Sequence, residues 1–183
     1  SSPPRAGLMA QNKKQMDRLW APWRKTYLRS TRVKSKGCLF CGLRRSKDDR
    51  KNLVVFRGKR FLLILNRYPY NNGHLLIVPK RHLACISQLD QEERQDFFTM
   101  LDLAQSALQT ALKPHGFNIG MNVSDVAGAG IPEHLHWHIV PRWKGDVNFM
   151  PVIAGDKVIS ESLDSAFVVL RQAIQAQKGL KKL

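Results

Sequence analysis

Residues 134–140 have the sequence His-Leu-His-Trp-His-Ile-Val, in which histidine alternates with large apolar residues. Successive side chains of a β-strand point to opposite faces, so a strand here places His134, His136 and His138 on one face. The apolar residues then anchor the other face in a core. Three adjacent imidazoles can supply a nucleophile, a proton donor and phosphate contacts at neutral pH. A metal-binding cluster or a chance cluster is the alternative, but the strict alternation argues against chance.

Four further strands are predicted around this stretch, which itself ends at Pro141. Apolar and β-branched runs bounded by turn residues mark each of them. These strands are expected at residues 53–56, 61–65, 74–78 and 117–121.

Two helices are predicted as well. Asp90 followed by Glu93 has the spacing of a capping box and begins a long helix that Pro114 and Gly116 close. Its apolar face recurs at helical spacing, as does that of a second helix near the C-terminus. The residues concerned are Phe97, Leu101, Ala104, Leu108 and Ala111 in the first helix, and Leu163, Phe167, Leu170 and Ile174 in the second. We therefore predict an α+β domain with a mostly antiparallel five-stranded sheet.

The 183 residues indicate one principal domain, placed at residues 18–177. Residues 1–17 are expected to be a flexible segment and residues 178–183 a frayed tail. Trp20 and Trp23 are costly to leave in water, so residues 19–24 are expected to dock on the body or on a partner subunit.

The net charge of +16 is distributed unevenly. Residues 1–60 contain 18 Lys and Arg against 3 Asp and Glu, whereas the remainder contains 12 against 11. An anionic partner, either nucleic acid or a polyphosphate, explains this asymmetry, and a solvated basic arm explains it equally well. One hypothesis is that this basic N-terminal region, which includes the charged loop at 44–51, favours an anionic second nucleophile or a longer phosphate chain.

No apolar run approaches the roughly 20 residues that span a bilayer, so no membrane segment is predicted. The first residues are not followed by a signal-peptide pattern, and three cysteines do not make a disulfide framework. These features favour a cytoplasmic protein. Cys85 is expected to be buried as a small apolar residue.

Cys38 and Cys41 form a Cys-x-x-Cys knuckle, which can supply two thiolates to tetrahedral zinc. A redox pair has the same spacing, but the strand–Cys-x-x-Cys–helix context of thioredoxins is not expected here. A structural zinc site within residues 38–41 is therefore preferred over free thiols.

The pattern His134-x-His136-x-His138 followed by two apolar residues resembles the histidine triad (HIT) superfamily of nucleotide hydrolases and transferases. Asn66, the Gly73-His74 pair and residues 78–82 fit the same resemblance, which spans about residues 20–149. Residues 20–24 and 141–149 are similar to the branch that contains diadenosine tetraphosphate phosphorylases and related hydrolases.

The resemblance implies a HIT-like fold and a role for each histidine. His136 would attack the α-phosphorus of a nucleoside polyphosphate and form a nucleotidyl-histidine intermediate. His138 would contact the phosphate and assist the leaving group, and His74 would complete the set. The implied nucleotide-binding residues are Asn66 at the ribose and Asn122, Gly130 and Ile131 at the phosphates.

Zinc-bearing relatives complete the cysteine pair with two histidines, and the matching positions are His82 and His134. His134 would then be a metal ligand rather than a catalytic donor. The resemblance also implies a homodimer whose strands continue across the two-fold axis. One departure is the Gly-Ile-Pro-Glu sequence at residues 130–133, where many relatives carry Gln, Ser or Thr. The polar contact to the leaving group must then come from backbone, from Asn122 or from elsewhere.

The resulting hypothesis is a nucleotidyl hydrolase or transferase that cleaves dinucleoside polyphosphates, such as diadenosine tetraphosphate, or related adenylated compounds. The sequence does not separate a phosphorylase from a hydrolase. A nucleic-acid-binding or nucleotide-sensing module, or a deadenylase of 5′-adenylated nucleic acid, is the alternative, supported by the basic N-terminal third.

Overall fold

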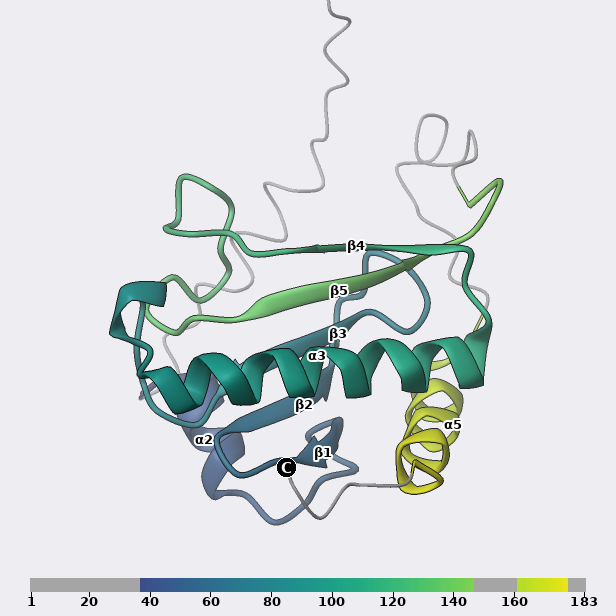
Figure 1. The fold of residues 1–183 in the computed structure, drawn as a ribbon, viewed down its shortest axis with the longest axis horizontal. Coiled ribbons are helices and arrows are strands. Elements are labelled where there is room, and N and C mark those ends of the chain that lie inside the picture. Colours follow the sequence, from purple (N-terminus) through teal and green to yellow (C-terminus); the bar gives the residue numbers. More distant parts are fainter. Residues whose placement is uncertain (1–36, 147–160, 178–183) are drawn as a thin grey trace, which may run out of the picture.

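The computed structural model describes residues 37–146 and 161–177 (Figure 1). A five-stranded sheet in these ranges has the order β1-β2-β3-β5-β4, and each pair of neighbours is antiparallel. The predicted α+β class and the antiparallel sheet are confirmed. The strands are β1 (Val54–Arg57), β2 (Phe61–Leu65), β3 (Leu75–Pro79), β4 (Gly116–Gly120) and β5 (Trp137–Arg142).

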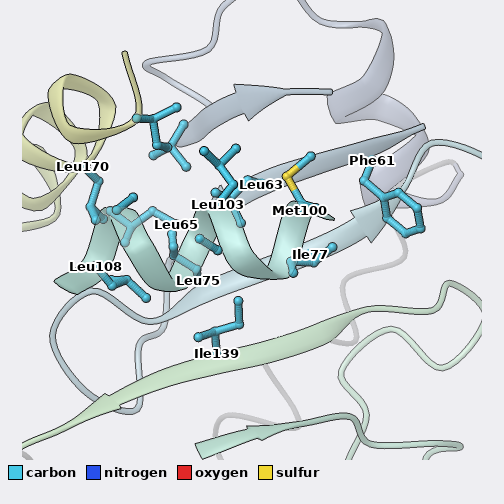
Figure 2. Packing of buried hydrophobic residues seen from close by; sticks show 14 of the residues in the cluster. Phe61, Leu63, Leu65, Leu75, Ile77, Met100, Leu103, Leu108, Ile139 and Leu170 are labelled. Atoms are coloured by element: carbon cyan, nitrogen blue, oxygen red, sulfur yellow. The ribbon is translucent and has the colours of Figure 1, made fainter. Parts of the chain in front are cut away.

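Two helices cover one face of the sheet. α3 (Gln91–Leu112) lies over the sheet roughly along the strand direction, and α5 (Leu163–Gln175) packs near its C-terminal end (Figure 1). Alternate residues of β2 and β3 point toward these helices and pack against Met100, Leu103 and Leu108 of α3 (Figure 2). The intervening residues of the same strands, including Leu62 and Leu76, belong to a separate buried cluster on the opposite face.

The predicted start of α3 is confirmed. The Asp90 carboxylate accepts a hydrogen bond from the Glu93 N–H, and the Glu93 carboxylate accepts one from the Asp90 N–H. The predicted apolar face is only partly right, because three of its members are partly buried while three other residues are fully buried. Since α3 packs on α5 as well as on the sheet, its buried stripe is wider than one helical row. The partly buried residues are Phe97, Leu101 and Ala111, and the additional buried ones are Met100, Leu103 and Ala107.

β1, β3 and β4 each lie one residue from their predicted positions, whereas β5 differs more. β5 begins at Trp137, because the Leu135 N–H donates to the Leu83 carbonyl beyond the end of β3. It continues through Pro141, where β3 no longer pairs, and the Pro141 carbonyl accepts from the Asn71 side chain. A proline is tolerated there because no ladder hydrogen bond needs its missing N–H.

A short helix, α2 (Leu39–Arg45), begins directly after Cys38 and was not predicted. The Cys-x-x-Cys pair therefore does open a helix, contrary to expectation. Phe40 anchors α2 in the buried cluster on the face opposite α3. The expectation that Cys85 is buried was wrong, since Cys85 lies exposed beside the short 3₁₀ turn Ile86–Gln88.

Residues 1–17, Trp20, Trp23 and residues 178–183, for which flexibility or docking was predicted, lie outside the described residues. Across the described ranges, no helix has the length and apolar character that crossing a membrane requires.

Candidate functional site

The three histidines lie on the sheet face opposite α3. His138 pairs with Leu76 of β3, which belongs to the cluster on that face, whereas Trp137 and Ile139 lie in the helix-side core. Phe40 of α2 packs against the rings of His134 and His136, at centroid distances of 5.3 and 5.2 Å. The predicted division of the stretch between two faces is therefore confirmed.

The His136 imidazole is held in one tautomer by the backbone. Its Nδ1 lies 2.8 Å from the His134 carbonyl oxygen, which can only accept, so the proton resides on Nδ1. Nε2 consequently carries the lone pair. Burial lowers the pKa of His136, so the ring is neutral at pH 7. A neutral imidazole with an available Nε2 lone pair is a nucleophile at physiological pH.

His74 and His138 form a second ordered pair. The Tyr70 N–H donates to Nδ1 of His74 at 3.0 Å, which places the His74 proton on Nε2. That Nε2–H donates to Nδ1 of His138 at 2.9 Å, so the His138 proton in turn resides on its own Nε2. Within the described part of the chain, this buried Nε2 has no hydrogen-bond partner. Burial, and then the charge of His136, lower the pKa of His138 to about 4. The site therefore presents an N–H of His138 that has no acceptor, beside an available lone pair on Nε2 of His136.

Asn66, the residue implied at the ribose, lies beside His74. The Tyr68 N–H donates to Oδ1 of Asn66 at 3.0 Å, and Nδ2 of Asn66 lies 3.3 Å from Nδ1 of His74. The side-chain amide is thus oriented at the end of β2, next to the histidines.

The other implied nucleotide-binding residues belong to the segment between β4 and β5. Asn122 follows Gly120, the partner of His138, and its amide donates to the Gly128 carbonyl at 3.5 Å. Ile131 packs against the cluster that contains Phe40, and Gly130 is exposed. Within residues 37–146 and 161–177, no hydrogen bond joins Asn122 or Gly130 to the triad.

The four implied metal ligands converge. One donor atom from each of Cys38, Cys41, His82 and His134 lies within 4.8 Å of all the others. Nδ1 of His134 is 3.2 Å from Sγ of Cys38 and 3.2 Å from Nδ1 of His82, and Sγ of Cys41 is 3.3 Å from that same His82 nitrogen. Zinc bonds of about 2.0–2.3 Å at tetrahedral angles separate ligand atoms by about 3.3–3.8 Å. The donor set and its spacing therefore fit Zn²⁺.

The tautomer of His134 also fits a metal. Its Nε2 lies 2.9 Å from the Pro79 carbonyl, so Nε2 carries the proton and Nδ1 directs a lone pair at the cluster. Metal-binding histidines commonly donate their other N–H to such a carbonyl. The ring of His134 thus faces the cysteines, whereas the backbone carbonyl of His134 faces the ring of His136.

Sequence reasoning missed three contributors to the site: the Phe40 ring, the Pro79 carbonyl and Tyr70. The Tyr70 ring is 49% exposed, yet it stacks on His138 at a centroid distance of 5.6 Å and an interplanar angle of 14°. A large aromatic residue within a turn four residues before His74 was the available signal.

The turn that carries Tyr70 is braced on its far side. The Asn71 amide donates to the Pro141 carbonyl at 2.9 Å and to the Asp146 carboxylate at 2.8 Å. Arg142 holds that carboxylate through two hydrogen bonds and keeps the pKa of Asp146 well below its usual range. The turn that carries the backbone N–H of Tyr70 is therefore supported by a partly buried polar network.

Comparisons with known proteins agree on one family. The model of the HIT domain matches residues 47–145. The chain is 40% identical over 156 residues to a protein of Mycobacterium tuberculosis named AP-4-A phosphorylase, covering 81% of this chain and 80% of that one. It is also 35% identical to a bis(5'-adenosyl)-triphosphatase of Saccharomyces cerevisiae, over 50% of this chain and 44% of the yeast protein.

Solved structures show the same fold. A Zn-bound histidine triad family protein from Mycobacterium smegmatis superimposes with a TM-score of 0.61 at 24% identity. The alignment covers 76% of this chain and 94% of that protein. The predicted HIT-like fold is confirmed.

Proposed function

Because this chain belongs to the histidine triad family, we propose that it cleaves dinucleoside polyphosphates, such as diadenosine tetraphosphate, or related adenylated compounds. The observation that carries the proposal is the arrangement of two neutral imidazoles, 5.1 Å apart between ring centroids. His136 offers a lone pair at Nε2, and His138 offers a buried, unpartnered N–H. Nucleotidyl transfer needs one nucleophile at the phosphorus and is assisted by a hydrogen-bond donor at the departing oxygen.

In the first step, Nε2 of His136 attacks the α-phosphorus. A P–N bond forms while the bond to the bridging oxygen breaks, and a dinucleoside tetraphosphate thereby releases a nucleoside triphosphate. The Nε2–H of His138 donates a hydrogen bond to the departing oxygen, and the nucleoside triphosphate leaves as the anion. The His134 carbonyl retains the Nδ1 proton of His136 and stabilises the positive charge that develops on the ring.

In the second step, an acceptor attacks the nucleotidyl-histidine and the P–N bond breaks. The proton that the acceptor loses passes to solvent, and the electron pair of the P–N bond returns to Nε2 of His136. Inorganic phosphate as acceptor gives a nucleoside diphosphate, whereas water gives a monophosphate. The relative named AP-4-A phosphorylase, at 40% identity, favours phosphate.

The nucleotide-binding roles belong to the same proposal. Asn66 would hold the ribose with its oriented amide, and Asn122 with the backbone of Gly130 and Ile131 would face the phosphates. The location of Asn66 beside His74, and of Asn122 two residues after the partner of His138, supports these roles.

Product analysis tests the reaction. Diadenosine tetraphosphate is incubated with the protein, with and without phosphate, and the nucleotides are separated by chromatography. ADP and ATP formed only with phosphate indicate a phosphorylase, and AMP and ATP in both buffers indicate a hydrolase. His136→Ala should abolish turnover, whereas His115→Ala, at an exposed histidine outside the cluster, should not. Turnover that His136→Ala leaves unchanged would refute the assignment.

We also propose that Cys38, Cys41, His82 and His134 bind a structural zinc ion. When bound, zinc supplies a cross-link between α2, the segment after β3 and the segment before β5, and it stabilises thiolates. Metal analysis should find about one zinc per chain, as expected for a closed four-ligand site. Cys41→Ser should lose the zinc, and Cys85→Ser, at an exposed cysteine outside the cluster, should retain it. Equal zinc in the wild type and Cys41→Ser would contradict the site.

Two further proposals concern partners and location. We propose a homodimer formed through the edge strand β4, because Ile119, Val123 and Val126 are exposed at or just beyond this edge. Cysteines kept as thiolates for zinc are typical of reducing compartments, which supports a cytoplasmic location.

Nucleic-acid binding is the second candidate function, since eight of the 24 residues from 37 to 60 are Lys or Arg. Three of those cations, Arg50, Arg57 and Arg60, already form ion pairs with carboxylates of the same chain. Oligonucleotide binding with a steep salt dependence would support this function, and absence of binding at moderate salt would dismiss it. Replacing Arg44, Arg45 and Lys47 without a change in KM or product ratio would dismiss the link between the basic loop and the acceptor.

A further inference from the structure

The ring of Tyr70 is an unexplained feature of the site. It is 49% exposed, although an aromatic side chain in a turn gains most by burial. It contacts two of the histidines rather than the apolar core. Its centroid lies 4.7 Å from that of His74 and 5.6 Å from that of His138.

The same residue also determines which ring nitrogen carries the proton in both histidines. Its backbone N–H donates to Nδ1 of His74, which leaves the His74 proton on Nε2 and, through Nδ1 of His138, leaves the His138 proton on Nε2. The side chain and the main chain of Tyr70 therefore act on the same pair of rings. The near-parallel stack, at 14°, restricts rotation of the His138 ring about its Cβ–Cγ bond.

The main chain of Tyr70 is itself fixed. Pro69 precedes it, and Asn71, which is buried, is held by the Pro141 carbonyl and by Asp146. His74 completes the turn by donating its backbone N–H to the Asn71 carbonyl at 3.2 Å. A main chain fixed in this way keeps a neighbouring catalytic group in its orientation before the substrate binds.

We propose that Tyr70 is a positioning residue for the reaction: its ring and its backbone N–H hold His138 with the unpartnered Nε2–H directed at the departing oxygen. This inference rests on the proposed function for what His138 does, but the orientation of His138 is independent of any substrate. The ring also stacks on one face of His138, the imidazole whose pKa is lowered by burial.

Within residues 37–146 and 161–177, the rings of His74, His136 and Tyr70 face His138, and Leu76 of β3 and Gly120 of β4 are its strand partners. Of these, only the imidazoles and the phenol titrate. A change in the titration of His138 after substitution of Tyr70 therefore reports on loss of the ring rather than on loss of a carboxylate or a lysine.

The experiment compares Tyr70→Phe and Tyr70→Leu in the full chain. Tyr70→Phe retains the ring and should keep kcat within about twofold, whereas Tyr70→Leu should lower kcat roughly 10- to 100-fold with a smaller change in KM, as loss of positioning does. Tyr68→Leu is the matched control, because Tyr68 is a 58% exposed tyrosine of the same turn whose backbone N–H contact survives the substitution. An equal loss in Tyr68→Leu would overturn the proposal in favour of a general role of the turn.

Imidazole nitrogen NMR provides the readout that does not depend on activity. In the wild type the His138 signal, assigned with His138→Asn, should show the Nε2–H tautomer and titrate at low pH. Tyr70→Leu should raise the pKa of His138 toward the ordinary value of about 6.5, while the tautomer, which depends on the backbone N–H that the substitution keeps, should stay the same. An unchanged titration in Tyr70→Leu would overturn the inference, even if the chain proved active. A wild type that shows this tautomer but no turnover would refute the proposed function instead.

Discussion

At the scale of single residues, backbone groups orient the imidazoles of the site. The His134 carbonyl fixes His136, the Pro79 carbonyl fixes His134, and the Tyr70 N–H fixes His74. No carboxylate is used for this purpose. Since backbone groups do not titrate, these three tautomers persist over the whole pH range in which the fold survives, and only protonation of the rings themselves ends them.

The pKa of His138, lowered to about 4 by burial, predicts how stability varies with pH. Between about pH 6.5 and pH 4, the unfolded chain binds a proton at this position and the folded chain does not. The free energy of unfolding should therefore be fully retained above pH 6.5 and should fall as the pH falls toward 4. His138→Asn should flatten this slope in urea titrations, whereas His115→Asn should leave it. A slope unchanged by His138→Asn would contradict the buried, neutral imidazole.

Gly73 offers a second prediction at this scale. Its φ is +69°, and a Cβ there would overlap Cδ1 of Leu112 and lie 3.0 Å from Cδ2 of Leu108. Gly73→Ala should lower the free energy of unfolding by about 1–3 kcal/mol, through strain and overpacking together. Chemical denaturation measures this, with Gly116→Ala, where a Cβ meets open space, as control. Equal stability of the two variants would refute the close contact.

The faces of the triad could be predicted from sequence because strand alternation is local. Histidine at every second position and apolar residues between them require no knowledge of the rest of the chain. Tyr70 and Phe40 could not be found in this way. Tyr70 contacts His138, which is 68 positions away in sequence, and Phe40 contacts His136, which is 96 positions away. Only the folded chain brings these residues together.

At the scale of elements, α2 is a helix that local sequence patterns do not predict. Seven residues are too few to form a stable helix alone, and no capping side chain precedes them. Tertiary contacts hold the helix: Phe40 is buried, and both cysteines lie at the metal cluster. α3 is the opposite case, because its capping box and 22 residues carry their own signal. The long helix was therefore predictable, and the short one was not.

Arg57 closes the C-terminal end of α2. Its guanidinium donates to the carbonyls of Leu43 and Ser46, at 3.2 and 2.7 Å, and pairs with Asp49 at 2.7 Å. Lysine keeps the charge but cannot reach several acceptors at once with one planar group. Arg57→Lys should therefore lower stability by about 1–2 kcal/mol, with the exposed Lys59→Arg as control. Amide exchange should accelerate first in residues 39–45, and uniform acceleration across the sheet would show that Arg57 has no local role.

At the scale of the whole molecule, the sheet separates stability from chemistry. The face toward α3 and α5 holds the larger apolar core, and the opposite face holds the histidines, the metal cluster and the smaller cluster around Phe40. Because the two faces share the same strands, a one-residue slip of β5 would move the histidines into the core. Both the site and the core therefore depend on the register of β5 with β3 and β4.

The sheet remains open at β4. Its outer edge has no strand partner within the described residues, and Ile119, on the helix side, is 42% exposed. Pairing with β4 of a second copy would satisfy the free backbone groups and cover this side chain, as closed two-fold interfaces do. Light scattering should therefore show a dimer for the wild type and a monomer for Ile119→Asp.

Val168→Asp provides the control for this last prediction, because Val168 has a similar exposure of 37% but lies on α5, away from the edge. It should remain dimeric, which separates the effect of the edge from a general effect of an added charge. A monomeric wild type would refute the interface. Dissociation of both variants would place the contact elsewhere on the molecule, since a continuous sheet through β4 leaves α5 outside the pairing edge. Ile119 pairs with Ile139 one residue from His138, so a dimer through β4 would also bring the two histidine clusters to the same sheet face.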